Sequence, residues 1–374
     1  MTETQTDTIA APLLLSPRAL MWRKFRRHKV AYFSLWLTGF IYLMAIFGEF
    51  IAPQAPDETN RRGIFAPPQG IHLFVETPDG GRDFQLHAKA RKMQIDQATM
   101  RRSYADDPDE IIPLGFFVTG FEYDLLGFIP TDRHFFGPID PGDTFYLLGS
   151  DRLGRDILSR IVMGTRVSMS IGLVGVLISL VIGVSLGGIS GYYGGWVDNV
   201  IQRLIEFLRS IPTIPLWMGL AAAIPLGWPP LRTYFVVMLI VSMIGWTSLA
   251  REVRGKFLSL RNEDFITAAR LDGLSDWAVI RRHMVPSFSS HIIASLTLAV
   301  PLMILAETSL SFLGIGLQPP IISWGTLLKE AQNIRTMVEA PWLLIAPGSM
   351  IVIAVLALNF LGDGLRDAAD PHAH

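Results

Sequence analysis

The sequence predicts an all-α polytopic membrane protein with six transmembrane helices and a separate insert between the first two. Half of the 374 residues are hydrophobic and only 17% are charged, which is too apolar for an ordinary soluble protein. Six apolar segments approach the roughly 20 residues that a helix needs to cross the hydrocarbon core. They are Val30–Phe50, Val167–Ile189, Leu204–Ile224, Thr233–Ala250, Ile292–Leu313 and Trp342–Leu361.

These segments divide the chain into an N-terminal tail (1–29), an anchor helix (30–50), an insert (51–165), a five-helix core (166–362) and a C-terminal tail (363–374). The anchor exceeds the roughly 7–15 apolar residues of a cleavable signal, so it is predicted to be retained. The insert contains no apolar run long enough to span, but it is rich in aromatic residues. We therefore expect a small folded element there.

Basic residues in short flanking segments predict the orientation. Six arginines and lysines precede the first segment and place the N-terminus in the cytoplasm; six crossings return the C-terminus to the same side. The loop between the fourth and fifth segments is then also cytoplasmic, and it carries seven arginines and lysines. The insert is predicted to lie outside.

Two features inside the membrane leave alternatives open. Gly183, Gly187 and Gly191 lie on one helical face, where small residues allow close helix packing, either within this chain or against a partner subunit. Glu307 lies inside the fifth segment and is either a pathway or gate residue or a buried hydrogen-bond partner. Pro212 and Pro215 favour a break in the third segment.

The cytoplasmic loop contains a charged, amphipathic stretch, Asp264–Pro286, which we call the coupling segment. Its composition predicts a short helix over residues 263–271, a turn at Gly273 and a second helix capped by Ser275. Trp277 begins an apolar repeat at spacings of three and four residues. Exposed apolar residues of this kind favour a protein contact.

The coupling segment resembles the EAA loop of ABC-importer permeases, whose pattern is Glu-Ala-Ala, three residues, Gly, nine residues and Ile-x-Leu-Pro. Ala268, Ala269, Gly273 and Pro286 match that register, and Thr267 stands in place of the Glu. His283 and Val285 replace the Ile and Leu. The resemblance implies that residues 267–272, including Asp272, contact a groove of an ATPase subunit.

Four further stretches resemble the dipeptide/oligopeptide permease C-type subunits: Leu147–Gly172, Gly191–Pro212, Leu310–Gly325 and Ala357–Pro371. The insert, around Gly120–Asp140, looks like that of the Yej-type permeases of microcin C and peptide importers. The resemblance implies a type I importer core in the bacterial inner membrane. It also implies a second homologous permease as heterodimer partner, one or more cytoplasmic ATP-binding subunits and a periplasmic peptide-binding protein.

The sequence predicts no enzyme activity on this chain. It lacks the G-x-x-x-x-G-K-[ST] phosphate loop, so ATP and Mg²⁺ are expected on the partner ATPase. There is no cysteine, and no catalytic or metal-ligating cluster is recognisable. A net charge of -1 gives no indication of nucleic-acid binding. The competing hypothesis is a secondary transporter or channel that works without an ATPase.

Overall fold

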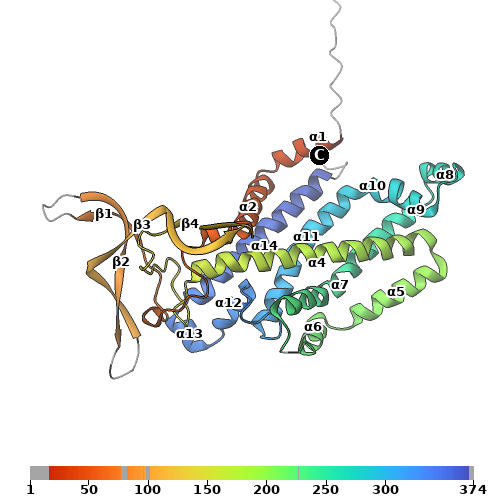
Figure 1. Cartoon of the computed structure of the whole chain (residues 1–374). Helices are drawn as coiled ribbons and strands as arrows, with labels where there is room; N and C mark the ends of the chain where they lie inside the picture. Colours follow the sequence, from red (N-terminus) through yellow and green to blue (C-terminus); the bar gives the residue numbers. More distant parts are fainter. Residues whose placement is uncertain (1–16, 77–81, 96, 98–101, 226, 370–374) are drawn as a thin grey trace, which may run out of the picture.

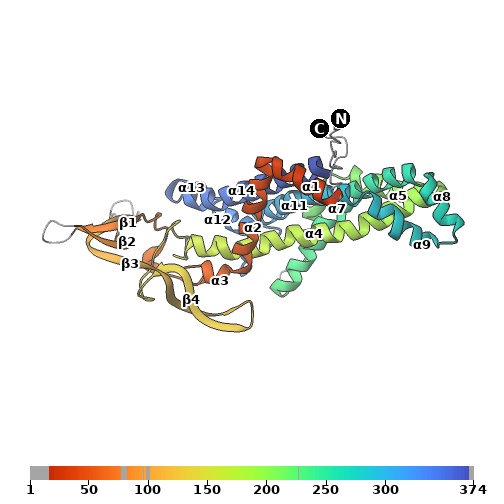
Figure 2. The same cartoon turned by 90° about the horizontal axis from the view of Figure 1, so that it is seen from above.

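The computed structural model describes residues 17–76, 82–95, 97, 102–225 and 227–369. The helices form an elongated bundle, and a four-stranded sheet projects from one end of it (Figure 1). Short helices cap the opposite end, and both views place them far from the sheet (Figure 2). We call these the sheet end and the coupling end.

Five helices in the described part of the chain are long and apolar enough to cross a membrane, as predicted for five of the six segments. These helices are α2 (Lys29–Ile46), α4 (Ile157–Tyr193), α7 (Pro230–Leu260), α11 (Ser289–Phe312) and α14 (Trp342–Ala369). Shorter helices are α1 (Pro17–Arg27), α3 (Gly48–Ile51), a 3-10 turn (Arg61–Gly63), α12 (Trp324–Glu330) and α13 (Ile334–Glu339).

The third predicted segment, Leu204–Ile224, is not one spanning helix. It is divided between α5 (Gly195–Ser210) and α6 (Thr213–Ala222). Ile211 and Pro212 between them have extended backbone angles, and Pro212 has no N–H to continue the helical ladder. The break expected from the prolines is confirmed.

Several helix ends differ from the sequence-based boundaries. α4 begins at Ile157, inside the predicted insert, because the Asp156 carboxylate accepts hydrogen bonds from the N–H and hydroxyl of Ser159, each at 2.7 Å. α14 continues to Ala369, into the predicted C-terminal tail. Part of the predicted N-terminal tail is the helix α1, which packs against α14 through Phe25.

The insert folds as an antiparallel sheet in the order β1 (Ile71–Glu76), β2 (Arg82–Ile95), β3 (Arg102–Leu125) and β4 (Ile129–Pro138). The first half of β3 pairs with β2 and its second half with β4. His134 fastens the sheet to α3, because its ring nitrogens lie 2.9 Å from the Glu49 carbonyl and 3.0 Å from the Phe121 carbonyl. The Glu49 carboxylate in turn pairs with Arg166 of α4.

The glycine stripe packs α4 against α7 within this chain. A Cβ added at Gly183 would lie 3.0 Å from the Leu249 side chain. At Gly187 it would collide with the Ala250 backbone, and at Gly191 it would lie 2.6 Å from Cβ of Phe257. Of the two alternatives for the stripe, packing inside one subunit is confirmed.

Candidate functional site

The coupling segment forms two short helices at the coupling end of the bundle (Figure 1). They are α8 (Asp264–Leu271) and α9 (Asp276–Val279), and Gly273 between them has a φ of +78°. Ser275 caps α9 by accepting a hydrogen bond from the Ala278 N–H at 3.4 Å. The predicted helix-turn-helix is therefore confirmed, with the glycine at the position that requires a left-handed backbone.

One face of the segment presents large apolar side chains to the outside. Leu271 is 83% exposed, Trp277 is 65% exposed and Phe265 is 44% exposed. Thr267, Ala268 and Asp272 are exposed beside them. A surface of this composition on a charged helical pair is typical of a protein-binding site.

The opposite face is buried, and it includes one residue that sequence reasoning assigned to the contact. Ala269 is only 4% exposed and packs with Ile266 against the Val253–Phe257 part of α7. The prediction that the Ala268–Ala269 pair forms the contact is therefore wrong for Ala269. Ala269 lies three residues after Ile266, so it shares the buried face of α8.

The apolar repeat that begins at Trp277 also divides between two faces. Ile280 and Met284 are buried, whereas Trp277 is exposed. The chain changes after α9 to a π-helix (Ile280–Met284) and then to α10 (Val285–Ser287). Pro286, the last residue of the coupling segment, lies inside α10, and the helical break falls two residues later at Phe288 (φ -127°), just before α11.

Tyr192, at the last turn of α4, joins both short helices of the segment. Its hydroxyl donates to Asp276 Oδ1 at 2.6 Å and accepts from Arg270 Nε at 3.2 Å. The Arg270 guanidinium carbon also lies 4.8 Å from the centroid of the Tyr192 ring. Sequence reasoning missed this residue, because the contact joins positions about 80 residues apart and no local pattern signals it.

A second polar cluster fixes the corner beside Tyr192. Arg254 donates from Nε and Nη2 to the two Asp198 carboxylate oxygens at 2.5 Å each, and Ser190 donates to Asp198 Oδ1. The hydrogen bonds from Arg254 hold the pKa of Asp198 below its usual range. Three helices, α4, α5 and α7, are therefore tied at the coupling end.

Glu307 of α11 is fully buried. Its Oε1 accepts hydrogen bonds from the Ser311 hydroxyl at 2.7 Å and the Ser323 hydroxyl at 2.8 Å. Ser323 is the N-cap of α12, so Glu307 holds the return from α11 into α12. Of the two roles considered for Glu307, the structure supports the buried hydrogen-bond partner. Glu307 is not among the residues that line the cavity described next.

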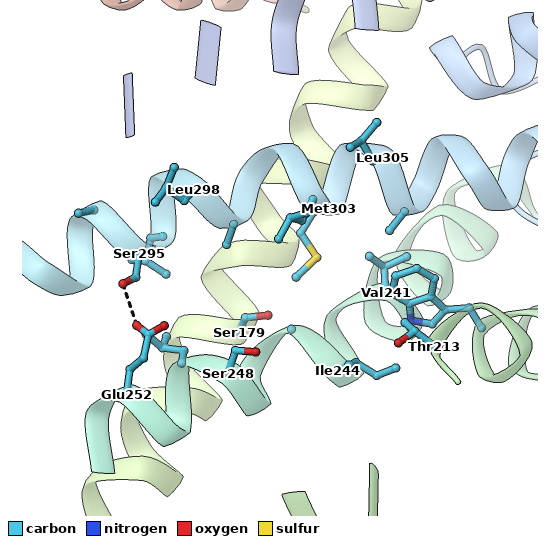
Figure 3. A pocket seen from close by; sticks show the side chains of 18 of the residues that line it. Ser179, Thr213, Val241, Ile244, Ser248, Glu252, Ser295, Leu298, Met303 and Leu305 are labelled. Carbon is cyan, nitrogen blue, oxygen red and sulfur yellow. Dashed lines mark hydrogen bonds between the residues drawn. The ribbon is translucent and has the colours of Figure 1, made fainter. Parts of the chain in front are cut away.

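A cavity of about 650 Å³ is lined by residues of α4, α6, α7 and α11 (Figure 3), together with Arg366 of α14. Its walls are mainly apolar, with Val241, Met303 and Leu298 among them. Glu252 lies on its wall, where its Oε2 accepts from the Ser295 hydroxyl at 2.8 Å and lies 3.7 Å from His291 Nε2. The volume is within the range of small-ligand sites.

Two buried polar atoms of cavity-lining residues have no hydrogen-bond partner among the described residues. They are the Ser179 hydroxyl oxygen and the Trp217 indole nitrogen. The two residues place polar groups within an otherwise mainly apolar wall. The walls of the cavity come from five separate helices, which is why the sequence did not predict it.

No group of three or more His, Asp or Glu side chains suited to a metal ion occurs in the described ranges. The bundle and its membrane-length helices define a multi-pass membrane protein that exposes an apolar helical face at one end.

Comparison with known proteins gives the family. The family described as "Binding-protein-dependent transport system inner membrane component" matches residues 158–374, and the "N-terminal TM domain of oligopeptide transport permease C" matches residues 16–68. The chain belongs to the binding-protein-dependent transport family of inner membrane components, as the resemblance predicted.

Curated relatives are permease proteins of transport systems. The chain is 40% identical to a glutathione transport system permease protein of Pectobacterium atrosepticum, over 67% of this chain and 77% of the relative. It is 31% identical to a dipeptide transport system permease protein of Lactococcus lactis, over 98% of this chain and 94% of the relative. Among solved structures, the inward-facing MetNI methionine ABC transporter matches with a TM-score of 0.43 and 18% identity, over 56% of this chain and 95% of that chain.

Proposed function

We propose that this chain is a transmembrane permease subunit of an ATP-driven importer that carries peptides across the bacterial inner membrane. The observation that carries the proposal is the exposed apolar face of α8 and α9 in a chain of the binding-protein-dependent family. The relatives' names mention glutathione, dipeptide and oligopeptide transport, which share peptide chemistry. The Yej-type resemblance of the insert points to microcin C-like or other peptides as cargo.

The sequence contains no phosphate loop, so the proposal assigns ATP and Mg²⁺ to separate cytoplasmic subunits and no catalytic step to this chain. A second permease would complete the pathway as a heterodimer, and a periplasmic peptide-binding protein would deliver cargo. Both chain termini and the coupling end would face the cytoplasm, with the sheet outside. The packing of Phe25 of α1 against Leu361 and Ala368 of α14 supports one side of the bundle for the two ends of the described chain.

The proposed mechanism runs from the coupling segment to the cavity. Closure of the ATP-binding subunits displaces α8 and α9, and the movement rocks the core helices between inward-open and outward-open arrangements. The cavity lies between α7 and α11, both of which pack near the coupling segment. A change in their separation would therefore alter access to it.

Co-purification tests the proposal. The tagged chain, extracted from its native membrane in mild detergent, should bring an ATP-binding subunit and a second permease. A Leu271→Asp variant should lose the ATP-binding subunit and keep the second permease, because Leu271 is the most exposed apolar side chain of α8 and a carboxylate there disrupts an apolar contact.

Leu20→Asp is the matched control, because Leu20 is an exposed leucine on α1, outside the coupling segment. This variant should retain both partners. A chain that purifies alone and transports or conducts without ATP would overturn the proposal in favour of the secondary transporter or channel.

A further inference from the structure

The Tyr192 hydroxyl is placed to carry movement from the coupling segment into the membrane helices. We propose that Tyr192 is a positioning residue: it locks α8 and α9 to the end of α4, so that displacement of the segment becomes displacement of α4. The inference rests on the proposed function and identifies the mechanical connection within it.

The first observation is that this connection stands alone. Apart from Ser287 and Ser289, whose hydroxyls bond within the adjoining turn to Met284 and Pro286, Tyr192 is the only described residue beyond the coupling segment whose side chain hydrogen-bonds to it. One hydroxyl engages α8 through Arg270 and α9 through Asp276, the two sides of the Gly273 turn. Apolar packing holds the segment against α7, but such packing is non-directional, whereas two hydrogen bonds at one atom fix a position.

The second observation concerns the covalent route from the segment to α11. After α9 the chain passes through a π-helix, the three-residue α10 and the non-helical Phe288 before α11 begins. Side-chain hydrogen bonds along this stretch are local, as in Ser287 to Met284 and Ser289 to Pro286. A stretch with two changes of helix type can absorb displacement, so the side contact with α4 is the stiffer route.

The third observation is what lies beyond Tyr192. Close packing at Gly187 and Gly191 joins α4 to α7, and the Asp198–Arg254 pair closes the same corner. Ser179 of α4 and Val241 of α7 both line the cavity. A pull on Tyr192 therefore reaches two walls of the cavity together.

If Tyr192 had a purely structural role, that role would depend on packing of its aromatic ring and not on its hydroxyl. Tyr192 is only 7% exposed, and its ring belongs to the apolar cluster around Phe257. Tyr192→Phe keeps this ring and removes only the hydroxyl, so it separates the two roles. Tyr193→Phe is the matched control, because Tyr193 is the next residue and 55% exposed, and it makes no hydrogen bond through its hydroxyl among the described residues.

The test uses the complete complex of both permeases, ATP-binding subunits and peptide-binding protein, reconstituted in vesicles. Peptide uptake and ATP hydrolysis are measured together. Tyr192→Phe should assemble and hydrolyse ATP like the wild type, while peptide transported per ATP falls about ten-fold or more, the change expected from loss of a hydrogen bond to a charged group. Tyr193→Phe should keep the wild-type ratio.

Asp276→Asn provides a second route to the same result if the phenylalanine variant fails to assemble. It leaves the tyrosine ring in place, weakens the acceptor and should also lower the transported-to-hydrolysed ratio. Combining it with Tyr192→Phe should add little, because both changes remove one link.

A wild-type ratio in the assembled single variants would overturn the proposal, as would a parallel fall of uptake and hydrolysis in both. Failure of the proposed function is a different result, since the wild-type complex would then show no ATP-dependent uptake.

Discussion

The two ends of the bundle are built on opposite principles. At the sheet end, Asp151, Arg155, Arg160 and Glu330 form a largely buried network: Arg155 Nε lies 2.6 Å from Asp151 Oδ2, and Glu330 Oε1 lies 3.0 Å from Arg155 Nη2 and 3.3 Å from Arg160 Nη2. At the coupling end, α8 and α9 expose large apolar side chains, and Tyr192 supplies the polar link between these two helices and α4.

The difference shows which surface is complete in one chain. Buried charges at the sheet end find their partners within α4, α12 and the preceding loop, so that end is fastened internally. The apolar face of α8 and α9 lacks a covering element in the described structure. We therefore expect substitutions at the sheet end to change stability and substitutions at the coupling end to change binding and transport.

The largest expected effect is from Arg160→Ala. Arg160 is 3% exposed, and its loss leaves Asp151 and Glu330 with one cation between them. Removing one partner of a buried pair costs about 3–5 kcal/mol of unfolding free energy. Unfolding in detergent should show the loss, whereas Arg203→Ala, which removes an exposed pair with Glu206, should cost less than about 1 kcal/mol. Equal losses would contradict the contrast between the ends.

The next prediction concerns how stability changes with pH. Asp156 at the sheet end and Asp198 at the coupling end should change the stability in opposite directions as the pH rises. Burial raises the pKa of Asp156 to about 6 from 3.8, so its contribution to stability is lost as pH rises through that window, by on the order of 3 kcal/mol. Asp198 has a lowered pKa, because of its Arg254 hydrogen bonds, so its contribution is lost as pH falls.

Unfolding measured across this pH range checks these signs. Relative to Asp156→Asn, the wild type should lose stability between pH 4 and 6 as the pH rises. Relative to Asp198→Asn, the wild type should lose stability in acid. The same slope for both pairs would show that the environments of the two carboxylates are not opposite.

A smaller effect is expected from Trp277→Ala. The side chain is mostly exposed, so the stability of the chain should change by less than about 0.5 kcal/mol. Its removal from an interface should weaken binding of the ATP-binding subunit by about 2 kcal/mol, measured as affinity for the purified subunit. Trp196→Ala, an exposed tryptophan of α5, is the control and should leave that affinity unchanged. If both variants bind alike, the docking face lies elsewhere.

The smallest effect is expected from Gly273→Val. No atom lies within 4 Å of an added Cβ, so the cost, about 1–2 kcal/mol, comes from the φ of +78° alone. The complex should insert and assemble, while transport decreases because the angle between α8 and α9 changes. Gly255→Val, at another open glycine in the regular helix α7, should transport normally. Normal transport by Gly273→Val would remove the turn from the mechanism.

The sequence predicted the parts of the fold that depend on composition and local chemistry. Five spans follow from apolar length, and the division after Ser210 follows from Pro212. The sheet did not follow, because β3 carries Pro108 and Pro113 among charged residues, which indicate a loop. The β2–β3 register shifts between Lys89 and Arg91, close to where Pro108 falls, and a β-bulge of this kind accommodates an irregular residue.

The candidate site was also predicted only in part, because some of its residues act locally and others depend on contacts with distant segments. Gly273 and Ser275 act locally, so their roles could be deduced from neighbouring residues. Which face of α8 is buried depends on α7, and that assignment failed at Ala269. The role of Tyr192 depends on its contact with Asp276, a residue distant in the chain, and such a contact cannot be deduced from a single sequence.

Because α4 is long, it connects the Tyr192 contact at the coupling end with the sheet end of the bundle. The helix runs for 37 residues, about 55 Å, from the Asp156 cap to Tyr193, the residue after Tyr192. In the proposed mechanism α4 acts as a lever, with the buried charge network as its fixed end and the coupling segment at its moving end. A tilt of about 5° about the fixed end would shift the moving end by about 5 Å, roughly one helical turn. A small rotation of α4 at the sheet end and a large displacement of its last turn at the coupling end would then be the same motion.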